Sequence, residues 1–155
     1  MRSIHQWLDE YGESHQNPVN KRIHWICVPA IVLSVIGLLW SIPVPAAFTE
    51  ISPALNWAVL LAMAAVVYYF MLSVPLALGA AAVLFLLLLA AAGLDHLATP
   101  LWVTSVVIFV VAWVGQFIGH HIEGRKPSFF KDLQFLMIGP LWLLAAAYRG
   151  AGLRY

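Results

Sequence analysis

Hydrophobic residues are gathered along this chain in long runs that short polar segments separate. Four runs have about the 20 mostly apolar residues that a membrane-spanning helix needs. They cover residues 23–40, 54–72, 76–94 and 101–119. Asn17 is suited to cap the first helix, with Pro18 at its first position. The pattern predicts an all-α integral membrane helical bundle of four spanning helices in a single domain, residues 1–155.

Two shorter apolar segments flank the four runs. Residues 3–11 place apolar side chains at helical spacing, opposite the acidic ones, which predicts an N-terminal interfacial helix. Packing of this helix on the protein itself is an equal alternative. Residues 135–148 form a run of about 14 residues with Gly139 and Pro140 inside it, which predicts a short C-terminal re-entrant or fifth helix. Whether this segment spans the membrane stays open.

Composition and charge agree with a bilayer as the solvent. The 155 residues are 63% hydrophobic and 10% charged, whereas soluble domains have about a quarter of their residues charged. No Lys or Arg lies between Arg22 and Arg125, and the net charge is +1. Nucleic-acid binding needs many phosphates to be neutralised, so it is excluded. The single cysteine, Cys27, has no partner for an internal disulfide.

The basic residues predict how the chain is oriented. Lys21 and Arg22 precede the first run, while Arg125, Lys126 and Lys131 follow the fourth. Four spans put both groups on one side, and basic residues near short spans mark the cytoplasmic side. We therefore expect a multi-pass protein with a cytoplasmic N-terminus, in the bacterial inner membrane or, in a eukaryote, the endoplasmic reticulum membrane.

The even number of predicted spans also brings together the polar residues at the two ends of residues 23–119. Asn20 and His24 share a helix face because they are four residues apart. Gln116, His120 and Glu123 share a face on the fourth helix by the same spacing. Ionisable groups near the membrane core usually face the bundle interior or a cavity and have a function. The two polar faces thus predict a site at the cytoplasmic face.

His15 lies just before the first run, so it should join His24 and His120. Imidazole is the commonest ligand of iron, zinc and copper, and several histidines with a carboxylate and open positions suit iron(II) and oxygen. Contact with headgroups or water is the alternative, and we favour the metal because three histidines meet. His121 points about 100° away from His120 and is either a further ligand or exposed. His96 lies across the membrane and is excluded.

Two motifs in these segments closely resemble the signature of the Mpo-type 2-hydroxy fatty acid dioxygenases. The first runs from Tyr11 through Ser14-His15-Gln16-Asn17 and Asn20 to Ile23-His24 and Pro29. The second contains Trp113, Gln116-Phe117, Gly119-His120, Glu123 and Pro127. Asp132-Leu133 and Gly139-Pro140 also fit the bacterial-type pattern. The resemblance covers nearly the whole chain.

This resemblance implies an iron(II)-dependent enzyme that uses molecular oxygen to shorten a 2-hydroxy fatty acid by one carbon, a step of alpha-oxidation. It implies His15, His24 and His120 as iron ligands, and it leaves Glu123 either a ligand or a neighbour of the ligands. The residues that we expect to contact the ligands or the substrate are Asn17, Asn20, Gln116, Lys21 and Arg125.

Two alternative functions stay open at this point. A membrane lipid hydroxylase or desaturase also combines histidines, iron and lipid, but such enzymes have more histidines, for two irons. A non-enzymatic metal-binding or transport protein is less favoured, because the second and third runs are almost wholly apolar. The sequence leaves open whether the chain forms a homo-oligomer.

Overall fold

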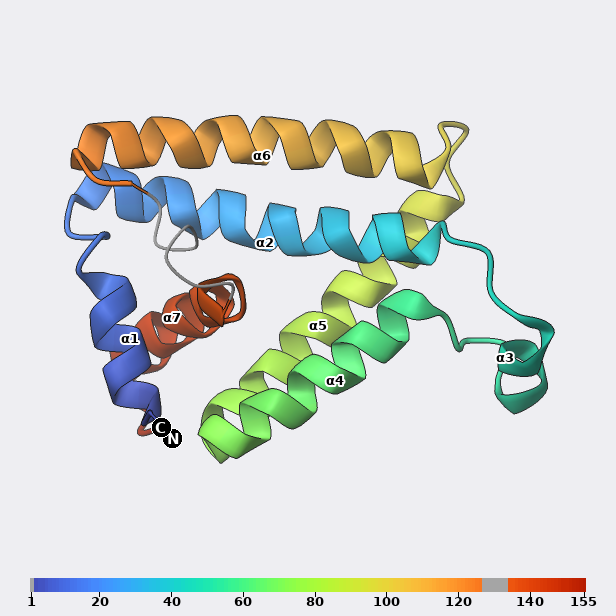
Figure 1. The fold of residues 1–155 in the computed structure, drawn as a ribbon, viewed down its shortest axis with the longest axis horizontal. Helices are drawn as coiled ribbons and strands as arrows, with labels where there is room; N and C mark the ends of the chain where they lie inside the picture. The colour runs from blue at the N-terminus through green and yellow to red at the C-terminus, as the bar shows by residue number, and fades with distance from the viewer. Residues whose placement is uncertain (1, 127–133) are drawn as a thin grey trace.

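The computed structural model describes residues 2–126 and 134–155, which form seven α-helices and no β-strand (Figure 1). The helices are α1 (Ile4–Gly12), α2 (Pro18–Trp40), α3 (Ala46–Ile51), α4 (Trp57–Leu72), α5 (Val74–Asp95), α6 (Leu101–Glu123) and α7 (Gln134–Gly150). The prediction of an all-α protein is confirmed. Pro127, Lys131, Asp132 and Leu133, which the sequence singled out, lie outside the described residues.

Three of the described helices, α2, α5 and α6, are long and apolar enough to cross a membrane. The helix α4 has 16 residues because it begins only at Trp57, where the side chain of Asn56 caps it by accepting a hydrogen bond from the Val59 N–H at 3.1 Å. The helix α7 has 17 residues. These apolar helices indicate a membrane protein. The number of four spans stays a prediction.

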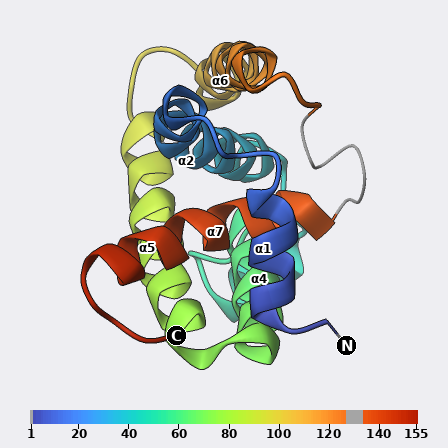
Figure 2. The same ribbon diagram turned by 90° about the vertical axis from the view of Figure 1, so that its left-hand side faces the viewer.

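The helices α2 and α6 lie side by side along their whole length and run in opposite directions (Figures 1 and 2). Small residues allow this close approach, as they do between helices in lipid. A Cβ atom added to Gly119 would overlap the side chain of Asn20, and one added to Gly115 would overlap that of Cys27. The N-terminal end of α2 is thereby fixed against the C-terminal end of α6.

The helices α4 and α5 form an antiparallel hairpin that crosses the α2–α6 pair (Figure 1). Ser73 makes the tight link, since it ends α4 and its hydroxyl caps α5 by accepting a hydrogen bond from the Leu76 N–H at 3.4 Å. The start of α2, this link and the end of α6 lie toward one end of the molecule, while α3 and the α5–α6 loop lie toward the other. The chain thus alternates between two ends, as the four apolar runs predicted.

The apolar face of α1 is covered by protein. Its four buried side chains pack with α7 and the α4–α5 hairpin, and they are Ile4, Trp7, Leu8 and Tyr11. The start of α1 is fixed by Ser3 and Gln6, each of which bonds the backbone N–H of the other. The sequence left open whether this segment lies in the membrane interface or packs on the protein. In the structure its apolar face packs on the protein. The α1–α7 pair closes the end at which α2 begins (Figure 2).

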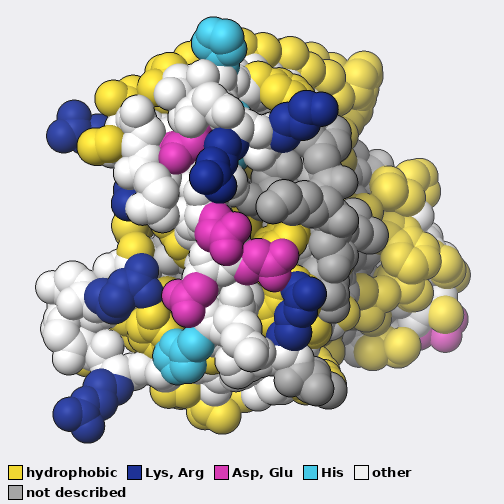
Figure 3. Space-filling view, turned by 60° about the vertical axis from the view of Figure 1, so that its left-hand side comes forward, with side chains coloured by type: hydrophobic (Ala, Val, Ile, Leu, Met, Phe, Trp, Pro, Cys, Tyr) yellow, Lys and Arg dark blue, Asp and Glu magenta, His cyan; other side chains and the backbone are white. Residues whose placement is uncertain are grey.

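Charged side chains gather on this same end of the molecule, and hydrophobic surface surrounds them (Figure 3). An ion pair links the exposed ends of α1, between Arg2 and Glu10 at 2.7 Å. Long charged side chains beside broad apolar surface are typical of the level at which a membrane protein leaves the bilayer.

Candidate metal centre

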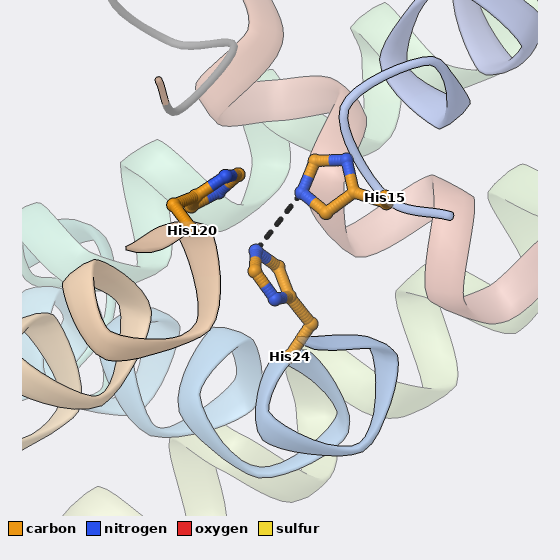
Figure 4. A group of neighbouring side chains, drawn as sticks. All are labelled: His15, His24 and His120. Atoms are coloured by element: carbon orange, nitrogen blue, oxygen red, sulfur yellow. Dashed lines mark hydrogen bonds between the residues drawn. The ribbon is translucent and has the colours of Figure 1, made fainter. Parts of the chain in front are cut away.

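Three histidines from three separate elements meet at the end of the molecule where α2 begins and α6 ends (Figure 4). His15 lies in the loop after α1, His24 on the first turns of α2, and His120 on the last turn of α6. All three are buried, and one nitrogen of each ring lies within 4.8 Å of the others. The predicted meeting of these residues is therefore confirmed. His96 ends α5 toward the opposite end of the molecule.

Backbone carbonyl groups fix the orientation of two of the rings. The Nδ1 atom of His15 donates to the carbonyl oxygen of Tyr11 at 2.7 Å, and Nδ1 of His24 donates to that of Asn20 at 2.9 Å. A neutral imidazole that carries its proton on Nδ1 has a lone pair on Nε2. These two Nε2 atoms face each other at 2.9 Å (Figure 4). Two lone pairs at this distance repel each other, and a cation bound by both atoms would remove that repulsion.

A metal ion fits this role better than a proton. Burial, and next the neighbouring His24, lower the pKa of His15 to about 3, so its ring is neutral at pH 7. The Nδ1 atom of His120 is buried without a hydrogen-bond partner, which is a costly state for a polar atom. Nitrogens on one ion lie at most about 4.2 Å apart, so small side-chain shifts would close this group around a metal.

Glu123 joins the loop of His15 to the helix of His120. One of its carboxylate oxygens accepts a hydrogen bond from the Gln16 N–H at 2.8 Å. The other accepts from the Asn17 N–H at 2.8 Å and from the Asn20 side chain at 3.0 Å. Charge-assisted bonds of this kind are the stronger ones. Both oxygens are thus engaged outside the histidine group, although the sequence had left a ligand role open for this residue.

Aromatic side chains form the wall behind His15. The ring of Tyr11 stacks on the His15 ring with centroids 4.2 Å apart and planes 8° from parallel. Trp142 contacts both rings from α7, with centroid distances of 5.7 Å to Tyr11 and 5.3 Å to His15. Burial raises the pKa of Tyr11, so its hydroxyl is neutral. Sequence reasoning gave these two residues no site role. Trp142 reaches His15 only through the packing of α7, and Tyr11, four residues before His15, appeared only as part of the first motif.

Two openings reach the histidine group from different sides. A cavity of about 50 Å³ has mostly apolar walls from α2, α6 and α7, and its wall also includes Gln116 and His120. A wider cleft of about 440 Å³ reaches His15 and has charged walls that include Asp9, Lys21 and Arg149. The site is therefore accessible both to an apolar group and to a polar one. Arg149 is a further residue that the sequence did not single out.

The other predicted site residues lie at different distances from the centre. Gln116 is buried and interacts with His24. Asn17 caps α2, where its side chain accepts a hydrogen bond from the Val19 N–H at 2.8 Å. The remaining two predicted residues, His121 and Arg125, are exposed. The structure does not bring His121 into the group of three, and it places Arg125 on the surface just after α6.

The chain is similar in sequence to proteins that are already known. The family model described as 2-hydroxy-palmitic acid dioxygenase Mpo1-like matches residues 1–150. A Saccharomyces cerevisiae protein named 2-hydroxy-palmitic acid dioxygenase MPO1 is 30% identical over 139 residues, which are 88% of this chain and 75% of the yeast protein. No solved structure matches the chain.

Proposed function

We propose, from the premise that this chain belongs to the Mpo1-like family of 2-hydroxy-palmitic acid dioxygenases, that it is an iron(II)-dependent dioxygenase acting on 2-hydroxy fatty acids. The observation that carries the proposal is the buried group of His15, His24 and His120. Three neutral imidazoles leave coordination positions open, and such sites suit iron and oxygen chemistry. The yeast relative's name supplies the substrate class.

The balanced reaction is that a 2-hydroxy acid and one O₂ give the acid one carbon shorter, carbon dioxide and water. The bond between the carboxyl carbon and the hydroxyl-bearing carbon is broken, and both carbons are oxidised while O₂ is reduced. A bound iron(II) would supply the site at which O₂ and the hydroxy acid meet. His15, His24 and His120 would hold the iron.

The chain's own polar groups orient this site. The carbonyls of Tyr11 and Asn20 keep the Nδ1 protons in place, so both Nε2 atoms stay ligands. Such outer partners fix the ring orientation and raise the basicity of a ligand. Glu123 acts as a positioning residue, since its three hydrogen bonds hold the loop of His15 against α6. Lys21, in the charged cleft beside His15, attracts the carboxylate of the acid.

We also propose that α2, α4, α5 and α6 cross the membrane, with the histidine group at the cytoplasmic face. The support is the alternation of these helices between two ends of the molecule and the gathering of charged side chains at the end that holds the histidines. Basic residues near short spans mark the cytoplasmic side. The polar end of a fatty acid would then meet the site at the membrane surface.

Three acids of one chain length test the proposed reaction, with a 2-hydroxy group, a 3-hydroxy group or no hydroxyl. Sites that bond a substrate hydroxyl reject an analogue lacking it by factors of about 10⁴ to 10⁵. We expect only the 2-hydroxy acid to be shortened, and mass spectrometry of the products shows the lost carbon. Equal conversion of all three acids, or a product of unchanged length, would refute the proposal.

A further inference from the structure

The wall of the small cavity beside the histidine group contains both polar and apolar residues. Its polar residues His120, Gln116 and Tyr11 are all buried. The other wall residues are apolar except for the indole of Trp113, and they are Val28, Ile31, Val32, Trp113, Phe135, Leu136, Gly139 and Pro140. This combination of polar and apolar groups suits an amphiphile whose head lies beside His120.

Part of the apolar wall belongs to the outside of the helix bundle, where lipid would lie. Leu136 is 44% exposed, and Val28, Ile31 and Val32 are half-buried on α2, one of the helices apolar enough to cross a membrane. The charged cleft that holds Lys21 opens separately, beside His15. The route for a tail and the route for polar groups are thus separate.

The cavity is also too small for a long acyl chain. A volume of about 50 Å³ holds on the order of four water-sized groups, and a methylene group is about as large as a water molecule. Only the carbons nearest the head of a fatty acid fit between α2, α6 and α7.

We propose that this cavity is a lateral opening for the acyl chain, so that only the carbons next to the 2-hydroxy acid group lie within the protein and the rest of the tail lies in the bilayer. This inference rests on the proposed function and names the part of the substrate that the site recognises. A branch at carbon 3 or 4 would contact the walls and be rejected. Extra carbons at the far end would stay in lipid, so chain length would matter little.

Photolabelling of the wild-type chain tests the opening without turnover. Two 2-hydroxy acids of equal length carry a diazirine, one at carbon 4 and the other near the methyl end. Each is illuminated without oxygen, with the protein in phosphatidylcholine nanodiscs, and the adducts are mapped by mass spectrometry. We expect the carbon-4 probe to label the cavity walls on α2 and α7, and the far probe to label mainly lipid. Equal labelling of these walls by both probes, or by neither, would overturn the inference.

Ile31 offers a second test, because it lines the cavity and belongs to neither apolar core cluster. Ile31→Trp should lower carbon-4 labelling and kcat/KM at least tenfold, with the metal content unchanged. Ile31→Ala should raise relative turnover of a 3-methyl-2-hydroxy acid severalfold. The control is Ile26→Trp on the same helix, which is 74% exposed and lines neither opening, and it should stay within twofold. Equal effects of the two tryptophans would also overturn the inference.

The two proposals fail in different ways. Wall labelling by the carbon-4 probe with no shortened acid formed would leave the opening in place and refute the dioxygenase. Formation of the shortened acid with labelling elsewhere would refute the opening alone.

Discussion

The α2–α6 pair and the α4–α5 hairpin are both antiparallel pairs of apolar helices, but their interiors differ. The buried residues of α4 and α5 are apolar apart from Tyr69, whose hydroxyl donates to the Met137 carbonyl at 2.9 Å. The α2–α6 pair buries six polar side chains, namely Asn20, His24, Ser34, Ser105, Gln116 and His120. Burial of polar groups costs free energy unless they are bonded. The six buried polar side chains therefore indicate a functional site in the α2–α6 pair and not in the hairpin.

Four of these polar side chains lie together at one end of the α2–α6 pair. Asn20, His24, Gln116 and His120 all lie where α2 begins and α6 ends, and the loop of His15 closes over them. The hairpin supplies the apolar wall on which α1 and α7 pack. The α2–α6 pair therefore holds two of the three histidines of the candidate metal site, and the hairpin contributes apolar packing.

The largest effect is expected from the histidines themselves. His15→Ala, His24→Ala or His120→Ala should remove bound metal and activity together, because catalytic metal sites typically have only three protein ligands beside their open position. His96→Ala, on an exposed residue toward the opposite end, should keep both. Metal analysis and turnover of the four variants measure this, and normal metal content in one of the first three rejects that residue as a ligand.

A smaller effect is expected from the carboxylate that holds the His15 loop. Glu123→Gln removes the charge that three hydrogen bonds share, and loss of an outer partner typically weakens metal binding 10- to 100-fold. Metal titration should show this weakening, with Glu123→Asp partly restoring affinity. Glu50→Gln, on the exposed α3, is the matched control. Unchanged affinity in Glu123→Gln would contradict the positioning role.

The same Gly→Ala change should have opposite effects in the two helix pairs. In α6, Gly119→Ala would push against Asn20, and such overpacking costs about 1–3 kcal/mol. In α5, Gly93 has open space around its Cα, so Gly93→Ala should stabilise the helix by about 0.5–1 kcal/mol. Thermal unfolding in detergent measures both. If Gly119→Ala proved the more stable of the two, the close α2–α6 contact would be wrong.

Helix periodicity and parity made part of the fold and of the site predictable from the sequence. The prediction that His15, His24 and His120 meet needed only an even number of membrane spans between residues 24 and 120. The start of α2 could be placed from Asn17 and Pro18, and both occupy the predicted positions. Such features depend on local helix-capping residues and on the number of membrane spans. Both can be inferred from a single sequence.

The rest depends on how loops and helices pack. The contact of Trp142 with His15 needs the packing of α7, for which no spacing rule exists. Two of the three bonds to Glu123, those from Gln16 and Asn17, depend on the shape of the loop before α2. The short helix α3 was not predicted, since its six residues show no amphipathic period.

The iron content of the chain, measured together with its turnover, decides whether the three histidines form a catalytic iron centre. The protein is purified without oxygen, its metals are counted, and it is then given oxygen and a 2-hydroxy fatty acid before and after a chelator strips it. We predict one iron per chain, loss of activity on stripping, and recovery with iron(II) but not with zinc. Shortened acid from metal-free protein, or two irons per chain, would contradict a mononuclear iron centre at these histidines.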